Sequence, residues 1–314
     1  MTDAVVATSS TSMAPQTIAM TGASGLVGEE LTALLTGNGH TVLPIKRGEK
    51  ADADAIRWDV ASGLTNPGRL AGVDTVVHLA GENIASGRWN AALKQKIRNS
   101  RTEGTRNLVQ SIAAIEDRPS TLICASAIGL YGDQQDKVLT EDSPAGDGFL
   151  ADVCREWEQE ANKATELGLR VVNVRIGVVL SPKGGALAKM LLPFKLGAGG
   201  IVGSGKQYWS WVGLNDLTRI ITHCIEDADI SGPVNAVSPN AMTNYDFTKA
   251  VGRVLKRPTI FPLPAFMAKL VLGEMAEALL LASTRVSPEK LQQSGFKFNH
   301  AELEDCLRHE LNLS

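Results

Sequence analysis

The stretch that decides the fold is Ile18-Ala-Met-Thr-Gly-Ala-Ser-Gly-Leu-Val-Gly28. A short apolar strand runs into three glycines spaced G-x-x-G-x-x-G, and a helical pattern follows at residues 29–35. In such a turn Gly22 permits the tight bend, Gly25 lets a phosphate approach the backbone, and Gly28 allows close helix–strand packing. The unpaired amides and positive dipole at the helix start then hold a pyrophosphate.

We therefore predict a dinucleotide site at this turn. The alternative is an ordinary glycine-rich turn, since 30 of the 314 residues are glycine. A strand before the motif and a helix after it favour the cofactor. Six residues of the turn are expected to contact it: Gly22, Ser24, Gly25, Leu26, Val27 and Gly28.

A second predicted strand, residues 41–45, ends at Lys46 and Arg47. At this position a dinucleotide fold usually carries an acidic residue that binds the ribose 2′-hydroxyl. A carboxylate would repel a 2′-phosphate, whereas arginine can bind one through two parallel hydrogen bonds. The two cations therefore predict NADP in preference to NAD. The alternative is that both are simply solvated at a strand end.

Further cofactor contacts are expected where later strands end. Asp59 closes a short strand at residues 56–60 on the adenine side, and the apolar strand 74–81 ends in small residues that leave room for a ligand. His78, inside that apolar run, is expected to be a hydrogen-bonded core residue. The remaining predicted contacts are Leu79, Ala80, Gly81, Arg101 of the helix at 87–110, and Ile176 of the strand at 170–180.

Strands alternate with helices over residues 16–180, which predicts an α/β, Rossmann-like, doubly wound parallel sheet. Residues 1–15 are expected to be a disordered extension, residues 16–180 an NADP-binding domain to which some later segments return, and residues 181–314 a smaller substrate domain. Glycine-rich stretches around the helix 187–194 predict a mobile region that closes over substrate.

Two helices of the second domain carry specific expectations. Asp216 is a plausible N-cap for a helix at 217–225. The apolar stretch Phe261–Ala282 contains two prolines and three charged residues, which is too interrupted for a membrane span. We expect it to form a buried amphipathic helix.

The composition is that of an ordinary globular protein, with 44% hydrophobic and 21% charged residues. A formal net charge of -3 gives no reason to expect a nucleic-acid partner. The four cysteines lie far apart without a C-x-x-C pair, so neither a disulfide framework nor a metal site is expected, and a cytoplasmic location fits best. The first residues do not resemble a secretory signal or transit peptide, and no membrane partner is expected.

Several motifs together resemble the extended short-chain dehydrogenase/reductase superfamily, which contains sugar-nucleotide epimerases and related reductases. They are Thr21–Gly28, Asp59-Val60, His78–Gly81, Ser126 with Tyr131-Gly132, and Trp211–Asp216. A narrower resemblance is to an atypical epimerase-like subgroup with a small C-terminal domain of unknown function. It rests on His78–Ile84, Leu191–Gly197, Gly203–Gly205 with Trp209–Trp211, and the tail from Pro262 to Phe298. The resemblance covers about residues 16–312.

The resemblance implies catalysis by Ser/Thr, Tyr and Lys, with the last two spaced Y-x-x-x-K. The helix that should carry this pair, around residues 149–158, contains neither residue. The Y-x-x-x-K at Tyr245–Lys249 falls on a helix of the substrate domain and is interpreted as a chance match. Ser126 stands at the family's hydroxyl position and is expected to bind a substrate carbonyl. Tyr131 is the nearest candidate proton donor, although without a lysine its pKa of about 10 would make it a poor base.

Three acidic residues on the same helix, Asp152, Glu156 and Glu158, are expected to be solvated or salt-bridged, with the alternative that one faces the nicotinamide. The leading hypothesis is an NADP-dependent oxidoreductase or epimerase-like enzyme that acts on a small carbonyl or hydroxyl compound. The second is an NADP-binding sensor or regulatory protein, since some relatives of the subgroup are described as cell-division factors. A sugar-nucleotide epimerase proper is disfavoured by Lys46-Arg47 and the absent dyad. The oligomeric state stays open, with a homodimer as one option.

Overall fold

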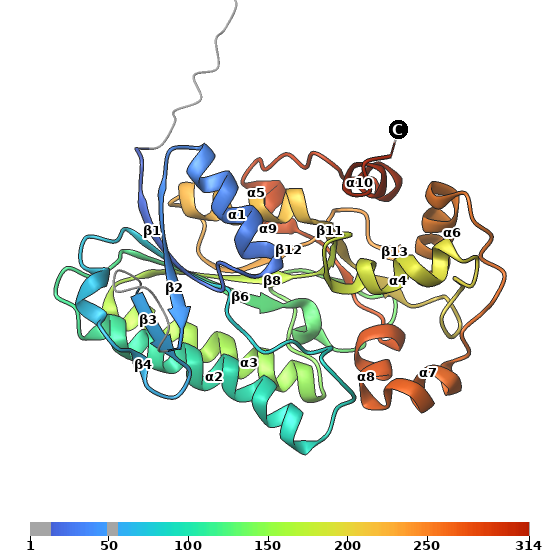
Figure 1. The fold of residues 1–314 in the computed structure, drawn as a ribbon, viewed down its shortest axis with the longest axis horizontal. Coiled ribbons are helices and arrows are strands. Elements are labelled where there is room, and N and C mark those ends of the chain that lie inside the picture. The colour runs from blue at the N-terminus through green and yellow to red at the C-terminus, as the bar shows by residue number, and fades with distance from the viewer. Residues whose placement is uncertain (1–13, 49–55, 314) are drawn as a thin grey trace, which may run out of the picture.

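A computed structural model describes residues 14–48 and 56–313 (Figure 1). Within these residues, eight strands form one sheet in the order β12-β8-β6-β5-β1-β2-β3-β4. Neighbouring strands are parallel except for β3 and β4. The strands are β1 (Thr17–Thr21), β2 (Thr41–Arg47), β3 (Ile56–Asp59), β4 (Gly63–Leu64), β5 (Thr75–His78), β6 (Thr121–Ala127), β8 (Arg170–Ile176) and β12 (Gly232–Ala236). The Rossmann-like fold class is confirmed. The predicted extension, residues 1–15, lies almost entirely outside the described residues.

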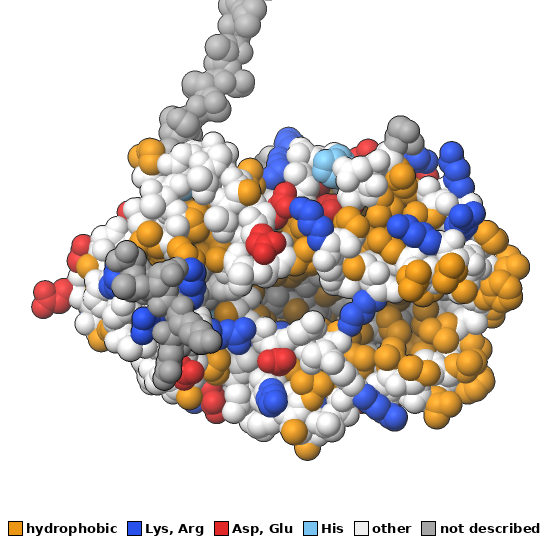
Figure 2. Space-filling model, viewed as in Figure 1, with side chains coloured by type: hydrophobic (Ala, Val, Ile, Leu, Met, Phe, Trp, Pro, Cys, Tyr) orange, Lys and Arg blue, Asp and Glu red, His pale blue; other side chains and the backbone are white. Residues whose placement is uncertain are grey.

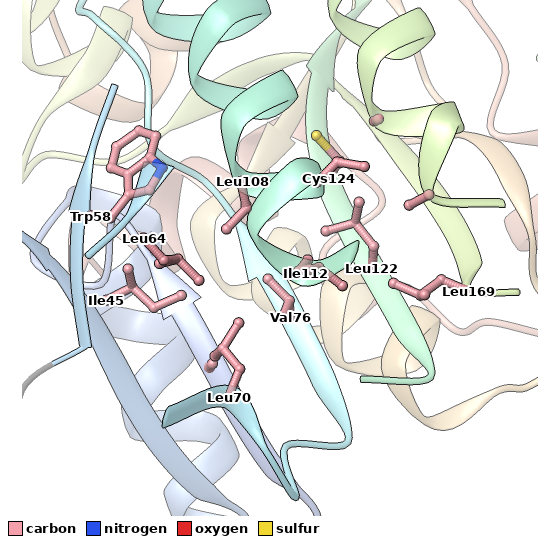
Figure 3. Packing of buried hydrophobic residues seen from close by; sticks show 14 of the residues in the cluster. Ile45, Trp58, Leu64, Leu70, Val76, Leu108, Ile112, Leu122, Cys124 and Leu169 are labelled. Atoms are coloured by element: carbon pink, nitrogen blue, oxygen red, sulfur yellow. The ribbon is translucent and has the colours of Figure 1, made fainter. Parts of the chain in front are cut away.

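Helices cover both faces of the sheet. On one face, α2 (Ala91–Ala113) and α3 (Phe149–Asn162) pack on it, and Leu108 and Ile112 of α2 point toward Val76 and Leu122 (Figure 3). On the other face, α1 (Leu26–Gly37) and α5 (Leu214–Glu226) pack against each other and against a second apolar core. The parallel strands are continuously hydrophobic because helices bury both faces of the sheet.

The order of the strands reverses at β1. The chain proceeds from β1 to β2 and β3 on one side, and then crosses to β5 on the other side of β1. In an open parallel sheet, ligands bind at the carboxyl ends of the strands next to such a switch point. Here the glycine-rich turn after β1 meets the segment that follows β5.

The predicted strand at 170–180 is two strands. It changes partners at Gly177, whose amide donates to the carbonyl of Ala236 in β12, while Val178 donates to Ser210. β9 (Val178–Leu180) then pairs with β11 (Trp211–Gly213) outside the main sheet. A Cβ atom on Gly177 would meet Val237 and the Ser210 carbonyl, so this crossing of chains requires glycine.

A third apolar core lies beyond the sheet, between α4 (Gly185–Lys195), α6 (Asn244–Leu255) and α10 (Leu303–Glu310). The smaller elements are the 3₁₀ turns Pro67–Leu70, Ile128–Tyr131 and Lys163–Leu167, the strands β7 (Val138–Leu139), β10 (Tyr208–Trp209), β13 (Met242–Thr243) and β14 (Arg285–Val286), and α9 (Glu289–Gln293). The loop before α4 lies against α1, because Lys183 pairs with Glu30 at 3.2 Å and Gly184 contacts Leu26.

The expected buried helix at Phe261–Ala282 is wrong. The segment forms α7 (Ala265–Leu272), α8 (Glu274–Ala276) and a π-helical turn at Glu277–Leu281. Gly273, with φ of +63°, ends α7 in a conformation that other residues rarely adopt. Phe266 and Leu270 of α7 are 70% and 72% exposed. None of the helices in the described ranges is both long and apolar enough to cross a bilayer.

The N-cap expected at Asp216 is also wrong. Helix α5 begins at Leu214, with Gly213 as its N-cap. Asp216 is buried in the first turn, where its two carboxylate oxygens accept hydrogen bonds from the amides of Asn299 and His300, each at 2.9 Å. Asp216 thus ties the C-terminal segment to α5, because its carboxylate binds amides of that segment and not amides of its own helix.

Candidate functional site

The glycine-rich turn has the geometry of a phosphate cradle. Gly22 has a φ of +74°, and a Cβ atom there would lie 3.0 Å from the backbone of Leu79 and Ala80. A Cβ atom on Gly28 would overlap the Gly22 carbonyl and the backbone of Ala23. Gly25 is the N-cap of α1 and has no side chain with which to cover the first-turn amides. These amides are the groups that bind phosphate in dinucleotide folds.

The segment after β5 closes against this turn. Leu79 donates to the Thr21 carbonyl at 3.3 Å, and the Ala80 amide donates to Thr21 Oγ1 at 3.2 Å. The structure therefore brings two groups of predicted cofactor residues together, although 51 or more positions separate them in the chain. Figure 2 shows a hollow that crosses this face of the molecule, with lysine and arginine side chains along it.

His78 is a core residue, as predicted. Its side chain is fully buried, Nδ1 is hydrogen-bonded to Thr21 Oγ1 at 2.7 Å, and Nε2 to Thr105 Oγ1 at 3.1 Å. Burial, and secondarily the charge of Arg101, lower the pKa of His78 to about 4. A neutral imidazole thus connects β1, β5 and α2 beneath the proposed cofactor turn.

The two cations expected to select NADP lie at the carboxyl end of β2, where both Lys46 and Arg47 are exposed. Asp59 lies at the end of the neighbouring strand, β3, and its Oδ1 accepts hydrogen bonds from the amides of Ala61 and Ser62. These three residues share the edge of the sheet at which the glycine turn lies.

Arg101 lies on α2 with its guanidinium against Gly81. Nη1 donates to the carbonyl oxygens of Glu82 and Ile97, at 3.0 and 3.2 Å, and the group stacks over Trp157 at 5.1 Å. Arg101 therefore shapes the segment after β5, at the same edge as the predicted cofactor residues. Ile176 ends β8, beside Ala127 of β6 and Ala236 of β12.

Ser126 belongs to a buried polar network. Its Oγ donates to Glu158 Oε1 of α3 at 2.7 Å. Arg175 of β8 binds the same carboxylate through Nε to Oε1 at 2.8 Å and Nη2 to Oε2 at 2.9 Å. Burial opposes the charge of Arg175, but the hydrogen bonds and charge of Glu158 raise its pKa overall. The hydroxyl proton of Ser126 thus points at a carboxylate that arginine holds in a fixed position.

Tyr131 is at the other end of this network. Its side chain is fully buried, and its hydroxyl donates to Asn235 Oδ1 at 2.7 Å and to the Thr140 carbonyl at 3.0 Å while it accepts from Arg175 Nη1 at 2.8 Å. A phenol has one proton, so the two acceptors share it. Burial raises the pKa of Tyr131 despite the opposing charge of Arg175. This geometry favours a structural role over proton transfer.

The three acidic side chains of α3 are salt-bridged, as predicted. Asp152 pairs with Arg155 at 2.8 Å, Glu156 with Arg98 at 3.5 Å, and Glu158 with Arg175. Tyr245 and Lys249 lie on α6, where Tyr245 is exposed and Lys249 donates to Thr259 Oγ1 at 3.0 Å. Helix α6 lies outside the main sheet, which agrees with the interpretation of this pair as a chance match.

Sequence reasoning missed Arg175 and Asn235 and did not connect Glu158 with Ser126. A signal was available, because Arg175 lies between Val174 and Ile176 near the end of a strand that is rich in valine. A charge on a buried strand requires a partner of opposite charge. The partner could not be chosen from the sequence, since several carboxylates lie on the preceding helix.

Comparison with known proteins identifies the family. The profile of the NAD dependent epimerase/dehydratase family matches residues 18–236, and a domain of unknown function, DUF1731, matches residues 263–310. The chain belongs to the NAD dependent epimerase/dehydratase family. The match and the C-terminal domain confirm the resemblance to the atypical epimerase-like subgroup.

Relatives match along nearly the whole chain. Epimerase family protein Mb2239 of Mycobacterium bovis is 43% identical over 295 residues, which cover 94% of this chain and 97% of the relative. The structure of human epimerase family protein SDR39U1, isoform 2, with NADPH has 34% identity and a TM-score of 0.85, over 95% of this chain and all of that one. A nucleoside-diphosphate sugar epimerase from Corynebacterium glutamicum has 38% identity and a TM-score of 0.78, and the match spans 58% of its length.

Proposed function

We propose that the protein is an NADP-dependent oxidoreductase or epimerase-like enzyme that acts on a small carbonyl or hydroxyl compound. The observation that carries the proposal is the contact between the Gly22 turn and the Leu79–Gly81 segment at the switch point of the sheet. The cradle fits a pyrophosphate because no side chain caps the first-turn amides of α1. Gly28, which has no Cβ atom, also lets α1 begin directly against the Gly22 carbonyl. Human SDR39U1, a relative with the same fold, was crystallised with NADPH.

Lys46 and Arg47 would hold the 2′-phosphate. They end the strand next to β1, which is where the adenosine ribose lies in dinucleotide folds. Asp59 would lie on the adenine side, one strand further from the glycine turn. The turn residues would bind the pyrophosphate, and Leu79, Ala80, Gly81, Arg101 and Ile176 would border the rest of the cofactor.

The bound nicotinamide would supply or accept a hydride. The chain's own contribution is the Ser126–Glu158 pair, in which the serine proton is already directed at the carboxylate. A substrate hydroxyl would donate to Ser126 Oγ and lose its proton to that oxygen, while Ser126 passes its own proton to Glu158. In the reverse direction Glu158 returns the proton to Ser126, which protonates the substrate oxygen. Arg175 positions Glu158 for this transfer, and Tyr131 and Asn235 support Arg175.

A second function is favoured by one observation. Helix α3 carries no Tyr-x-x-x-Lys pair, and the hydroxyl of Tyr131 is already occupied by Asn235, Thr140 and Arg175. A protein that binds NADP with little turnover, and acts as a sensor or regulator, including one in cell division, needs no such pair. We also propose that the protein is located in the cytoplasm.

The test is a fluorescence titration with NADPH and NADH, followed by a panel of carbonyl and hydroxyl compounds. Preference for NADPH with turnover of any compound supports the enzyme. Tight NADPH binding without turnover on the whole panel supports the sensor. Failure to bind either nucleotide overturns both.

A further inference from the structure

We propose that the C-terminal part of the molecule docks on anionic phospholipid membranes through an apolar surface bordered by cations. The surface consists of exposed side chains on α4 and its C-cap Leu196, on the segment 256–261 and on α7, and we call it the apolar–basic surface. Its apolar members include Leu196, Ile260, Phe261, Phe266 and Leu270. This inference does not depend on the proposed function, and it would revise the expectation that the protein has no membrane partner.

The apolar side chains are concentrated in one part of the chain. Of the eleven large hydrophobic side chains that are exposed in the described residues, nine lie between residues 192 and 271. Leu196, Ile260 and Phe266 are each 70% exposed or more. Figure 2 shows hydrophobic side chains gathered at the right-hand end of the molecule, where Figure 1 places α6 and α7. Exposed apolar surface of this extent marks an interaction site.

Hydrogen bonds to backbone carbonyls hold these segments side by side. Arg257 Nε donates to the carbonyl of Lys195 at the end of α4, at 2.9 Å. The Leu263 amide donates to Ile201 at 2.8 Å, and Gly203 donates back to Leu263 at 2.9 Å. The end of α4, the segment through Ile260 and Phe261, and the start of α7 therefore form one continuous region of the surface.

Cations border the same region. A hollow of about 350 Å³ next to Ile260 is lined by four basic residues and no acidic one: Lys249, Arg253, Lys256 and Arg257, with Gly252, Pro258 and Thr259. Glu304 neutralises Arg253 at 2.6 Å, whereas Lys256 and Arg257 are exposed and have no acidic partner in the described ranges. A phospholipid phosphate is the anion that suits a basic hollow beside exposed apolar side chains.

The charges of Lys256 and Arg257 favour a membrane over a second copy of the chain as the partner of this surface. A symmetric dimer would place this surface on both sides of the interface, and α4, residues 256–261 and α7 contain no acidic residue that could pair with Lys256 and Arg257. The interface of an anionic bilayer instead accepts phenylalanine and leucine side chains below the headgroups, while lysine and arginine remain at the phosphates. The chain as a whole has a net charge of -3, so an anionic bilayer would repel its other surfaces. The protein would therefore dock with the apolar–basic surface facing the bilayer.

The experiment is flotation of the full-length protein with phosphatidylcholine vesicles that do or do not contain phosphatidylserine. We expect flotation with phosphatidylserine and its loss at high salt. The variant Lys256→Glu/Arg257→Glu should lower the partition coefficient by roughly tenfold or more. Phe261→Ser/Leu270→Ser should also lower the partition coefficient on vesicles with phosphatidylserine, and Lys256→Arg/Arg257→Lys should partition like the wild type.

A matched control lies on another surface. Lys137 and Val138 are both exposed, so Lys137→Glu/Val138→Ser makes the same kinds of change elsewhere. This control should float like the wild type, and all variants should keep wild-type NADPH binding and unfolding transitions. Absence of flotation with phosphatidylserine overturns the proposal, as does flotation that the surface variants leave unchanged. A dimer in sedimentation velocity that Phe261→Ser/Leu270→Ser dissociates, without vesicle binding, would assign the surface to a second copy instead.

Discussion

Arg175 of β8 holds Glu158 of α3 through two parallel hydrogen bonds, at 2.8 and 2.9 Å, in the space between the sheet and the helix. Both side chains are about nine-tenths buried. The pair connects Ser126, Tyr131 and Asn235 into one network, so it links the candidate substrate-binding hydroxyl to the stability of the sheet.

Replacement of Arg175 by methionine should strongly destabilise the protein. It leaves the buried carboxylate of Glu158 without its cation, which typically costs about 3–5 kcal/mol. Urea unfolding of the wild type and the variant measures this loss. Arg98→Met is the matched control, because Arg98 pairs with Glu156 of the same helix at an exposed position, and it should cost less than about 1 kcal/mol. Equal losses in the two variants would contradict the buried network.

Alanine at Gly28 should distort the cofactor cradle. The new methyl group would overlap the Gly22 carbonyl, so the turn or the start of α1 must shift. We expect NADPH affinity to fall by at least about tenfold and stability to fall by about 1–3 kcal/mol. Isothermal titration and urea unfolding measure the two effects. Gly37→Ala, at the other end of α1, meets nothing within 4 Å and should bind NADPH like the wild type.

Alanine at Arg47 should weaken NADPH binding about 10- to 100-fold and leave NADH binding almost unchanged, because one charge-assisted hydrogen-bond set to the 2′-phosphate is removed. Arg118, which precedes β6 at the opposite edge of the sheet, supplies the control Arg118→Ala. Fluorescence titration compares the two nucleotides. A similar loss for NADPH and NADH would refute the assignment of the 2′-phosphate site.

Where turnover is found, Ser126→Ala and Glu158→Gln should each lower kcat by about a hundredfold or more without weakening NADPH binding. The double variant should be little slower than either single variant, since the two residues act as one unit. Glu156→Gln, two residues away on α3, should retain wild-type kcat. Steady-state kinetics together with NADPH titration measure these effects, and an unimpaired Ser126→Ala enzyme would show that substrate does not bind at this hydroxyl.

Stability should decrease as the pH falls from about 6.5 to about 4. His78 stays neutral in the folded protein down to a pKa of about 4, whereas an unfolded histidine takes up its proton near pH 6.5, so the unfolded state binds more protons in this window. The loss reaches about 3 kcal/mol below this range. Urea unfolding at a series of pH values should show a flatter dependence for His78→Gln. His309→Gln, at an exposed histidine, should keep the wild-type slope.

The sequence by itself determined the cofactor turn and the sheet. Gly22, Gly25 and Gly28 could be interpreted because local backbone sterics dictate where glycine is required, and the β-branched strands could be located because burial on both faces leaves a continuous apolar pattern. The position of His78 in the core followed from the same pattern.

Only the tertiary structure decided which polar groups meet. Asp216 looked like an N-cap, but the amides that bind it come from Asn299 and His300, more than 80 residues later. Glu158 and Arg175 are joined because α3 packs on the sheet in one register. Helix α7 exposes apolar side chains because only Ala268 of that helix is buried. Local sequence specifies backbone conformation and burial, whereas hydrogen bonds and ion pairs between distant segments depend on how the packed elements place their side chains.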